Sequence, residues 1–314
     1  MKISDIFLQN FRPGTIETMG FGYDILKHLN PRIIMINVSA YGQYGPYSER
    51  VGFDSIGQAL GGLMSLTGSI NDPPIRTFFP LIDRITALHA TIGALAAIHE
   101  REISGKGQTI DVCLADTGFT VNEIPISSYL GDGTIQQKEG NGSGISNSYQ
   151  TSDGWVYMTA NGDNMWKRIC DAMEHPEWTN NPMFITEATR EEHVLELEKE
   201  LAQWFQNKTT ENIVKILSQF SIPCAPINSV EEAANDPHLH EREILVEVED
   251  DIAGKIHVTG KTIKFGRTPM VVGSAPTIGS HSKEILQDIL GYTQNHIQTL
   301  EDAGIINCGA HDNT

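Results

Sequence analysis

Residues 32–39 read RIIMINVS, an apolar run broken at one interior position and about as long as one strand. Apolar side chains on both sides of a strand are typical of a parallel sheet that helices cover on both faces. The loop YGQYGP at residues 41–46 follows this strand directly. Because ligands bind at the carboxyl ends of the strands in such sheets, we expect this loop near a binding site.

The surrounding segments repeat the alternation of strand and helix. DIFLQN at residues 5–10 and TIDVCL at residues 109–114 predict two further strands. Between the strands, helical patterns reach to about Leu29 and run from Phe53 to Leu66. The fold class predicted for this part of the chain is α/β.

A long apolar helix is predicted from Asp83 to about Glu102. Its apolar side chains recur at spacings of three or four, which is the period of one helical face: Ile85, Leu88, Ile92, Leu95 and Ile98. Small residues, Gly93, Ala94 and Ala97, permit a neighbouring element to approach closely. We interpret this segment as a core helix.

The amino-acid composition of the chain changes at residue 131. Residues 131–144 are polar and rich in glycine, as a linker or loop is. A strand at residues 155–160 and charged amphipathic helices at 191–206 and 211–220 follow. We expect residues 131–244 to form this linker and a smaller α+β domain, with residues 1–130 and 245–314 forming the large domain.

The C-terminal segment is predicted to contain antiparallel strands and a closing helix. Residues 256–258 and 263–265 alternate as strands do, and a helix is expected from Ser282 to about Gly291.

Composition limits the possible functions of the 314-residue chain. With 39% apolar and 20% charged residues it is typical of a globular protein. A net charge of −18 argues against nucleic-acid binding, which needs a basic face. A phosphorylated ligand would therefore meet a local basic patch.

Cysteine spacing and hydropathy indicate the compartment. The four cysteines are far apart, without the spacing of a zinc site or a disulfide framework. The first residues lack the apolar core of a signal peptide, and no uninterrupted apolar run of about 18 residues follows. We expect a cytoplasmic protein with reduced thiols, without a metal site and without a membrane partner.

Asp83 at the start of the long helix has two interpretations. As an N-cap, its carboxylate would accept hydrogen bonds from free backbone N–H groups. As a reactive group, it would be an anion that the positive end of the helix stabilises, with apolar neighbours that exclude water from it. Its position alone does not separate the two.

Several ordered motifs resemble the family III CoA-transferases of the CaiB/BaiF type, which include formyl-CoA and carnitine CoA-transferases. These motifs are QNFRPG (9–14), LNPR (29–32), YGQYGP (41–46), GFDSIGQA (52–59), GGLMSLTG (61–68), ID (82–83), GKGQTIDV (105–112), SDGW (152–155), IPCAP (222–226) and APTIGSH (275–281). The resemblance implies an incomplete Rossmann-like large domain that binds CoA, beside a smaller α+β domain. It also implies a homodimer with interlocked subunits.

The resemblance implies that Asp83 is the catalytic nucleophile. Its carboxylate would attack an acyl-CoA substrate to form a mixed anhydride, and the released CoA would return to form an aspartyl-CoA thioester. A small carboxylic acid would then accept the CoA. No metal takes part.

Other site residues follow from the same resemblance. Asn10, Phe11 and Arg12 match the segment that contacts CoA, and Tyr41 belongs to a loop that would line the pantetheine channel or pack at the sheet edge. Gly142 and Gly144 match approximately a glycine loop that covers the active site, although an interdomain linker remains an alternative.

Two departures from the family pattern leave rival functions open. Racemases of the same fold use a histidine that would fall at Phe53, and phenylalanine transfers no proton, so a transferase is favoured over an α-methylacyl-CoA racemase. Family members also carry several tens of residues before the motif at Asn10. A truncated chain, or a non-catalytic partner subunit completed by another polypeptide, is therefore the third hypothesis.

Overall fold

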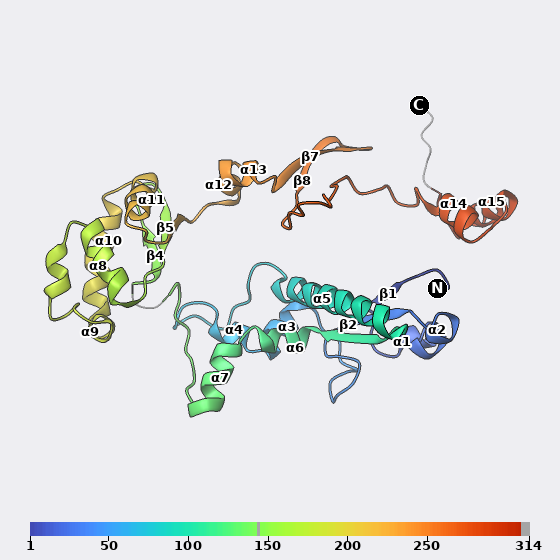
Figure 1. Cartoon of the computed structure of the whole chain (residues 1–314), viewed down its shortest axis with the longest axis horizontal. Coiled ribbons are helices and arrows are strands. Elements are labelled where there is room, and N and C mark those ends of the chain that lie inside the picture. The colour runs from blue at the N-terminus through green and yellow to red at the C-terminus, as the bar shows by residue number, and fades with distance from the viewer. Residues whose placement is uncertain (143–144, 309–314) are drawn as a thin grey trace. The chain divides into compact units, whose positions relative to one another are not determined.

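The computed structural model describes residues 1–142 and 145–308 (Figure 1). Two compact units divide the chain, Met1–Pro226 and Ile227–Thr314. The first unit contains a parallel and an antiparallel sheet, and the second contains a hairpin with short helices.

The parallel sheet has three strands in the order β1-β2-β3. Strand β1 spans Ile6–Gln9, β2 spans Ile34–Ser39 and β3 spans Thr109–Cys113. The central strand β2 pairs in parallel with both neighbours, and this confirms the α/β prediction. The apolar run of β2 is explained by this central place, since both of its faces are covered.

Alternate side chains of β2 enter two different cores. Ile34 and Ile36 pack against alanines of the long helix α5 (Leu81–Ser104). The preceding Ile33 and the intervening Met35 face the opposite core, which helices α1 (Thr15–Thr18) and α2 (Tyr23–Leu29) complete. Helices therefore lie on both faces of the sheet, with α5 running along one of them (Figure 1).

Helix α5 begins two residues before Asp83, at Leu81, with Pro80 at its N-cap position. The N-cap interpretation of Asp83 is therefore wrong, because Asp83 is the third residue of the helix. By length and composition α5 also resembles a membrane span. Its buried Ala90, Ala94 and Ala97 pack against the sheet, whereas Leu88, Ile92 and Leu95 of the predicted apolar face are exposed. The prediction of a core helix is therefore confirmed for the alanine face and wrong for the face of larger apolar residues.

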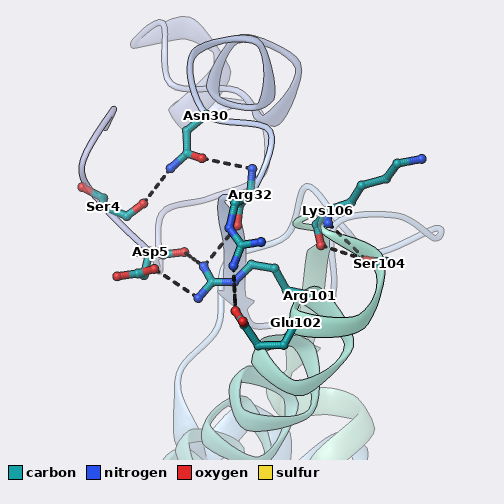
Figure 2. A network of polar contacts seen from close by, with 8 residues as sticks. All are labelled: Ser4, Asp5, Asn30, Arg32, Arg101, Glu102, Ser104 and Lys106. Atoms are coloured by element: carbon teal, nitrogen blue, oxygen red, sulfur yellow. Dashed lines mark hydrogen bonds and ion pairs between the residues drawn. The ribbon is translucent and has the colours of Figure 1, made fainter.

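Figure 2 shows how the C-terminal end of α5 is fastened to the sheet. The side chain of Arg101 is buried and donates hydrogen bonds to the backbone carbonyl oxygens of Asp5 (3.3 Å) and Arg32 (3.2 Å). It also pairs with the Asp5 carboxylate at 3.1 Å, while Arg32 donates to Glu102 at 2.6 Å. These contacts fix α5 relative to the starts of β1 and β2.

Glycines break the helix that was predicted from Phe53 to Leu66 into two. The observed helices are α3 (Asp54–Leu60) and α4 (Leu63–Leu66), and Gly62 between them has a φ of 87°. A Cβ on Gly61 would lie 2.1 Å from the backbone carbon of Gly118 in helix α6 (Leu114–Thr120). Helices α3 and α6 thus pack backbone to backbone. Helix α7 (Glu123–Asp132) follows α6.

The antiparallel sheet β4-β5-β6 supports the second large core of the first unit. Its strands are β4 (Asn147–Gln150), β5 (Trp155–Met158) and β6 (Cys224–Pro226). The accompanying helices are α8 (Gly162–Ala172), the 3-10 helix η1 (Pro176–Asn180), α9 (Glu187–Glu192), α10 (Val194–Gln206) and α11 (Thr210–Gln219). Buried Trp166, Leu201 and Phe205 belong to this core, which has the predicted α+β composition.

The second unit contains an antiparallel pair of strands, as predicted, but one of the two strands lies elsewhere in the sequence. Its elements are α12 (Val230–Ala234), α13 (Pro237–Glu241), β7 (Leu245–Asp250), β8 (Gly254–Thr259), α14 (Ser282–Glu284), the π-helix η2 (Ile285–Ile289) and α15 (Gln294–Asp302). The partner of β8 is β7, whereas residues 263–265 form no strand.

The assignment of residues 245–314 to the large domain stays a prediction, as does the Rossmann-like, interlocked homodimer.

Candidate active site

A groove of about 750 Å³ opens beside the parallel sheet. Ile6 and Leu8 of β1, Ile36 of β2 and Ala90 and Ala94 of α5 supply apolar walls. At the carboxyl ends of the strands the lining becomes polar, with Asn10, Ser39 and Asp83. Asp83 is the sole ionisable side chain among the described residues that line the groove. The groove therefore presents one carboxylate in largely apolar surroundings.

The carboxylate of Asp83 has a raised pKa. Partial burial in the groove is the larger cause, and the nearby negative charge of Asp54 raises the pKa further. Both effects disfavour the ionised form relative to a carboxylate in water. Since much of the residue is still exposed in this chain, a substrate in the groove can reach it.

Asn10 reaches the same groove because the chain turns sharply after β1. The buried Gln9 donates from Nε2 to Oδ1 of Asn37 at 2.8 Å, and its Oε1 accepts from the backbone N–H of Phe11 at 2.7 Å. This side chain thus fixes the turn that carries Asn10. Of the four predicted CoA-binding residues, Asn10 is the one found with Asp83 among the groove residues.

Arg12 and Tyr41 meet instead at the loop that follows β2. Arg12 donates from Nη2 to the backbone carbonyl of Glu49 at 2.9 Å. The next residue, Arg50, stacks on the ring of Tyr47 at 3.7 Å, and that ring contacts Tyr41 edge to face at 5.9 Å. The guanidinium groups of Arg12 and Arg50 thus lie at this loop, and so does the carboxylate of Asp111, which accepts from the backbone N–H of Gln43 at 2.9 Å.

The remaining predicted residues are not brought to the groove. Phe11 is exposed and is not among the groove-lining residues. Gly142 lines a separate hollow of about 320 Å³ with Leu66 and Pro125. Its φ is 154°, and a Cβ added to it would lie 1.9 Å from the Ser146 carbonyl oxygen, so there is no room for a side chain. Gly144 lies outside the described residues.

Asp54 was not singled out from the sequence although it lies beside the candidate nucleophile. It is the first residue of α3 and is 7% exposed. Its Oδ1 accepts hydrogen bonds from the backbone N–H groups of Ile82 (2.7 Å) and Asp83 (3.1 Å). The available signal was its place in the GFDSIGQA motif, next to the Phe53 position that was considered for a racemase base.

The chain is thus an α/β protein with one acidic residue in an apolar groove at the carboxyl ends of parallel strands. A family model described as CoA-transferase family III matches residues 1–282. The chain belongs to this family.

Two curated relatives and one solved structure resemble the chain over most of its length. The succinyl-CoA–D-citramalate CoA-transferase of Chloroflexus aurantiacus is 36% identical over 307 residues, which are 96% of this chain and 76% of that protein. The beta subunit of succinyl-CoA–L-malate CoA-transferase from the same organism is 31% identical over 311 residues, covering 96% and 77%. A CaiB/BaiF family protein from Brucella suis superposes with a TM-score of 0.81 at 25% identity, covering 92% of this chain and 76% of that one. The chain thus spans about three quarters of these relatives.

Proposed function

We propose that the protein transfers CoA reversibly from an acyl-CoA to a carboxylic acid, with Asp83 as the nucleophile. The observation that carries this proposal is the single, partly desolvated carboxylate of Asp83 in an otherwise uncharged groove. Membership of CoA-transferase family III supports the reaction class. The names of the two Chloroflexus relatives support an acyl-CoA donor and a carboxylate acceptor.

The first half of the reaction moves CoA onto the protein. An oxygen of Asp83 attacks the acyl carbon of the donor, a C–O bond forms, and the C–S bond breaks with its electron pair leaving on sulfur. The CoA thiolate then attacks Cγ of Asp83 in the mixed anhydride and displaces the donor carboxylate. The product is an aspartyl-CoA thioester, in which the energy of the thioester is conserved.

The second half reverses these steps with the acceptor. Its carboxylate attacks Cγ of Asp83 and releases the thiolate, and the thiolate attacks the acyl carbon of the new anhydride. Acceptor acyl-CoA leaves and the Asp83 carboxylate is regenerated. No proton and no electron is gained or lost over the cycle, so no redox cofactor is required.

Contacts to CoA are assigned to the residues around the groove and the loop. Asn10 lines the same groove as Asp83, while the Arg12 guanidinium, at the same loop as Arg50, suits a phosphate of the nucleotide. Phe11 and Tyr41 would contact the rest of the cofactor. The amides of Gly142 and Gly144 would stabilise the oxyanions if their loop closes over the groove.

Trapping of the acyl intermediate tests the nucleophile. The full chain is incubated with succinyl-CoA, chosen because two relatives are named for it, and then with hydroxylamine. Peptide mass analysis should find a hydroxamate at Asp83 in the wild type and none in Asp83→Asn. Turnover retained in Asp83→Asn, or an active wild type without this adduct, would overturn the proposal.

The glycine loop has its own test. Gly142→Ala should lower turnover, because the added Cβ would meet the Ser146 carbonyl oxygen at 1.9 Å and displace the loop. Gly131→Ala, in the same segment, is the control, since its φ is not left-handed and its added Cβ meets no described atom within 4 Å. Equal turnover in the two variants would favour the linker interpretation of residues 131–144.

The two rival functions predict different results. A racemase would exchange the α-proton of a 2-methylacyl-CoA with deuterium from solvent, and we expect no exchange because Phe53 in the groove carries no proton to transfer. A non-catalytic partner subunit would fold but would not complete a CoA site alone, and would give neither adduct nor turnover. One of the relatives is named as a beta subunit, so turnover should also be measured with any polypeptide that copurifies with the chain.

A further inference from the structure

Asp54 occupies the place that a capping residue of α5 would normally occupy. Both backbone N–H groups that it accepts, from Ile82 and Asp83, belong to the first turn of the helix, where intrahelical partners are missing. The two residues are 28 and 29 positions away from Asp54 in the sequence. A carboxylate on another helix, α3, therefore caps α5.

The second oxygen of Asp54 is fixed by Gln58, one turn further along α3. Gln58 is fully buried and donates from Nε2 to Oδ2 of Asp54 at 2.5 Å. Its Oε1 accepts from the backbone N–H of Thr77 at 3.0 Å, and its Nε2 also donates to Oγ1 of Thr77 at 3.1 Å. The Thr77 N–H determines which end of the amide is the acceptor, so Nε2 must face Asp54.

Because Asp54 caps α5, the carboxylate of Asp83 is not needed to cap the helix. At the third position of a helix, an acidic side chain often turns back to the N–H of the N-cap residue. Here the N-cap residue is Pro80, which has no N–H, and Asp54 has taken two N–H groups of the first turn. Among the described residues, no hydrogen bond to the Asp83 carboxylate is found, so its oxygens are free to react.

We propose that Asp54 is a positioning residue for the Asp83 nucleophile: it caps α5 in place of Asp83 and keeps a second negative charge next to the reactive carboxylate. This inference rests on the proposed function, because it assigns Asp54 a role in the same reaction.

The charge of Asp54 has a chemical consequence that a neutral cap would lack. It raises the pKa of Asp83 in addition to the effect of burial, and a more basic carboxylate is a stronger nucleophile. The side chains that β1, β2 and residues 52–53 contribute to the groove carry no charge that would compensate. Arg84, the next residue of α5, is not among those lining the groove.

Moving the charge while keeping the two hydrogen bonds that cap α5 separates the two roles of Asp54. Asp54→Asn can still accept from Ile82 and Asp83 through Oδ1, but its Nδ2 would face the donor of Gln58. In the double variant Asp54→Asn with Gln58→Glu, Nδ2 of the new asparagine would donate to the new carboxylate, and the Thr77 N–H keeps an acceptor. The donation from position 58 to Oγ1 of Thr77 is lost, because a carboxylate has no N–H. The negative charge then lies one side chain further from Asp83.

The first readout needs no substrate. Aspartate labelled with ¹³C at Cγ is incorporated into the full chain, and the Asp83 resonance is identified by its loss in Asp83→Asn. We expect the pKa of Asp83 to fall in Asp54→Asn and in the double variant, with the double variant closer to the wild type in stability. An unchanged Asp83 pKa in both variants would overturn the role of the charge, even if the protein proved to have no transferase activity.

The second readout is the rate of transfer with succinyl-CoA. Misplacing a reactive group typically costs up to about a hundredfold in rate, so kcat should fall about ten- to a hundredfold in Asp54→Asn, with KM for acyl-CoA changed less than kcat. A folded Asp54→Ala protein with the kcat of the wild type would contradict the proposal. Absence of an Asp83 adduct in an active wild type would instead reject the proposed function and leave the titration result standing.

Discussion

Oδ1 of Asp54 accepts a hydrogen bond from the backbone N–H of Asp83 at 3.1 Å, although 29 positions separate the two residues. One acid thus serves the structure of the helix and the other remains free for chemistry. The division explains how a carboxylate at a helix start, where most acids act as caps, is available to a substrate.

Replacement of the two acids should affect stability unequally. Asp54→Ala removes the acceptor of two N–H groups and of Gln58 in a buried place, and each unsatisfied buried group costs about 1–3 kcal/mol. We expect the free energy of unfolding to fall by about 2–4 kcal/mol. Asp83→Ala should change it by less than about 0.5 kcal/mol, as exposed substitutions usually do.

Urea unfolding of the two variants, followed by circular dichroism, measures this difference. Comparable loss of stability in both would contradict the capping role of Asp54. Because Asp83→Ala is expected to stay folded, its loss of turnover can be attributed to the missing nucleophile.

The raised pKa of Asp83 predicts an unusual pH dependence of stability. A carboxyl group whose pKa is higher in the folded state than in the unfolded state, about 3.9, binds its proton more tightly when folded. Its favourable contribution is therefore complete below the unfolded value and is lost as pH rises through the folded value. The free energy of unfolding of wild type minus that of Asp83→Asn should decrease as pH rises from about 4 through the raised pKa of Asp83.

The activity should depend on the same group in the opposite sense. The nucleophile is the ionised form, so kcat/KM should fall as pH falls through the raised pKa of Asp83, at a higher pH than for an ordinary aspartate. Asp54→Asn should move this acidic limb to lower pH. An acidic limb that is the same in both proteins would show that another group controls the rate.

The parallel sheet was predictable because its signal is local. The run at residues 32–39 became β2, paired on both sides and buried on both faces. In contrast, the break between α3 and α4 depends on contact with α6, where Gly61 meets Gly118. A helical period does not contain this information, so the sequence predicted one helix from Phe53 to Leu66.

The sequence pointed to the candidate nucleophile, Asp83, but not to Asp54, which holds the start of its helix in place. Resemblance pointed to Asp83 and Asn10, which line one groove. Asp54 was overlooked because its role requires α3 to lie against the start of α5, a long-range relationship. For the same reason, the sequence could not exclude the cap interpretation of Asp83, which the contacts of Asp54 with the first turn of α5 do exclude. The role of Asp83 as nucleophile stays a proposal.

Because α3 and α6 are in backbone contact, we expect that replacing a glycine of α6 by alanine destabilises the protein, contrary to helix propensity. Alanine is favoured over glycine inside a helix by about 1 kcal/mol. In Gly118→Ala, however, the new Cβ would lie 2.2 Å from the carbonyl oxygen of Gly57, and relief requires the helices to separate. We expect a loss of about 3 kcal/mol or more in the free energy of unfolding, by comparison with overpacked cores.

Gly131→Ala in α7 is the matched control. Its added Cβ meets no described atom within 4 Å, so propensity alone should act, and stability should be unchanged or higher by up to about 1 kcal/mol. Thermal unfolding of both variants measures the contrast. Equal melting temperatures would mean that α3 and α6 are not in backbone contact.

Replacement of Arg101 tests how much its contacts at the C-terminal end of α5, remote from Asp83, contribute to stability. Arg101→Ala would leave the carbonyl oxygens of Asp5 and Arg32 without this donor and would open space at a buried side chain. The free energy of unfolding should fall by about 2–4 kcal/mol in urea titrations, because buried polar partners lose their hydrogen bonds. Arg84→Ala removes the same type of side chain from an exposed place on the same helix and should change stability by less than about 0.5 kcal/mol. If Arg101→Met, which keeps much of the aliphatic volume, proved as stable as the wild type, packing rather than the polar contacts of Arg101 would be what holds this end of α5.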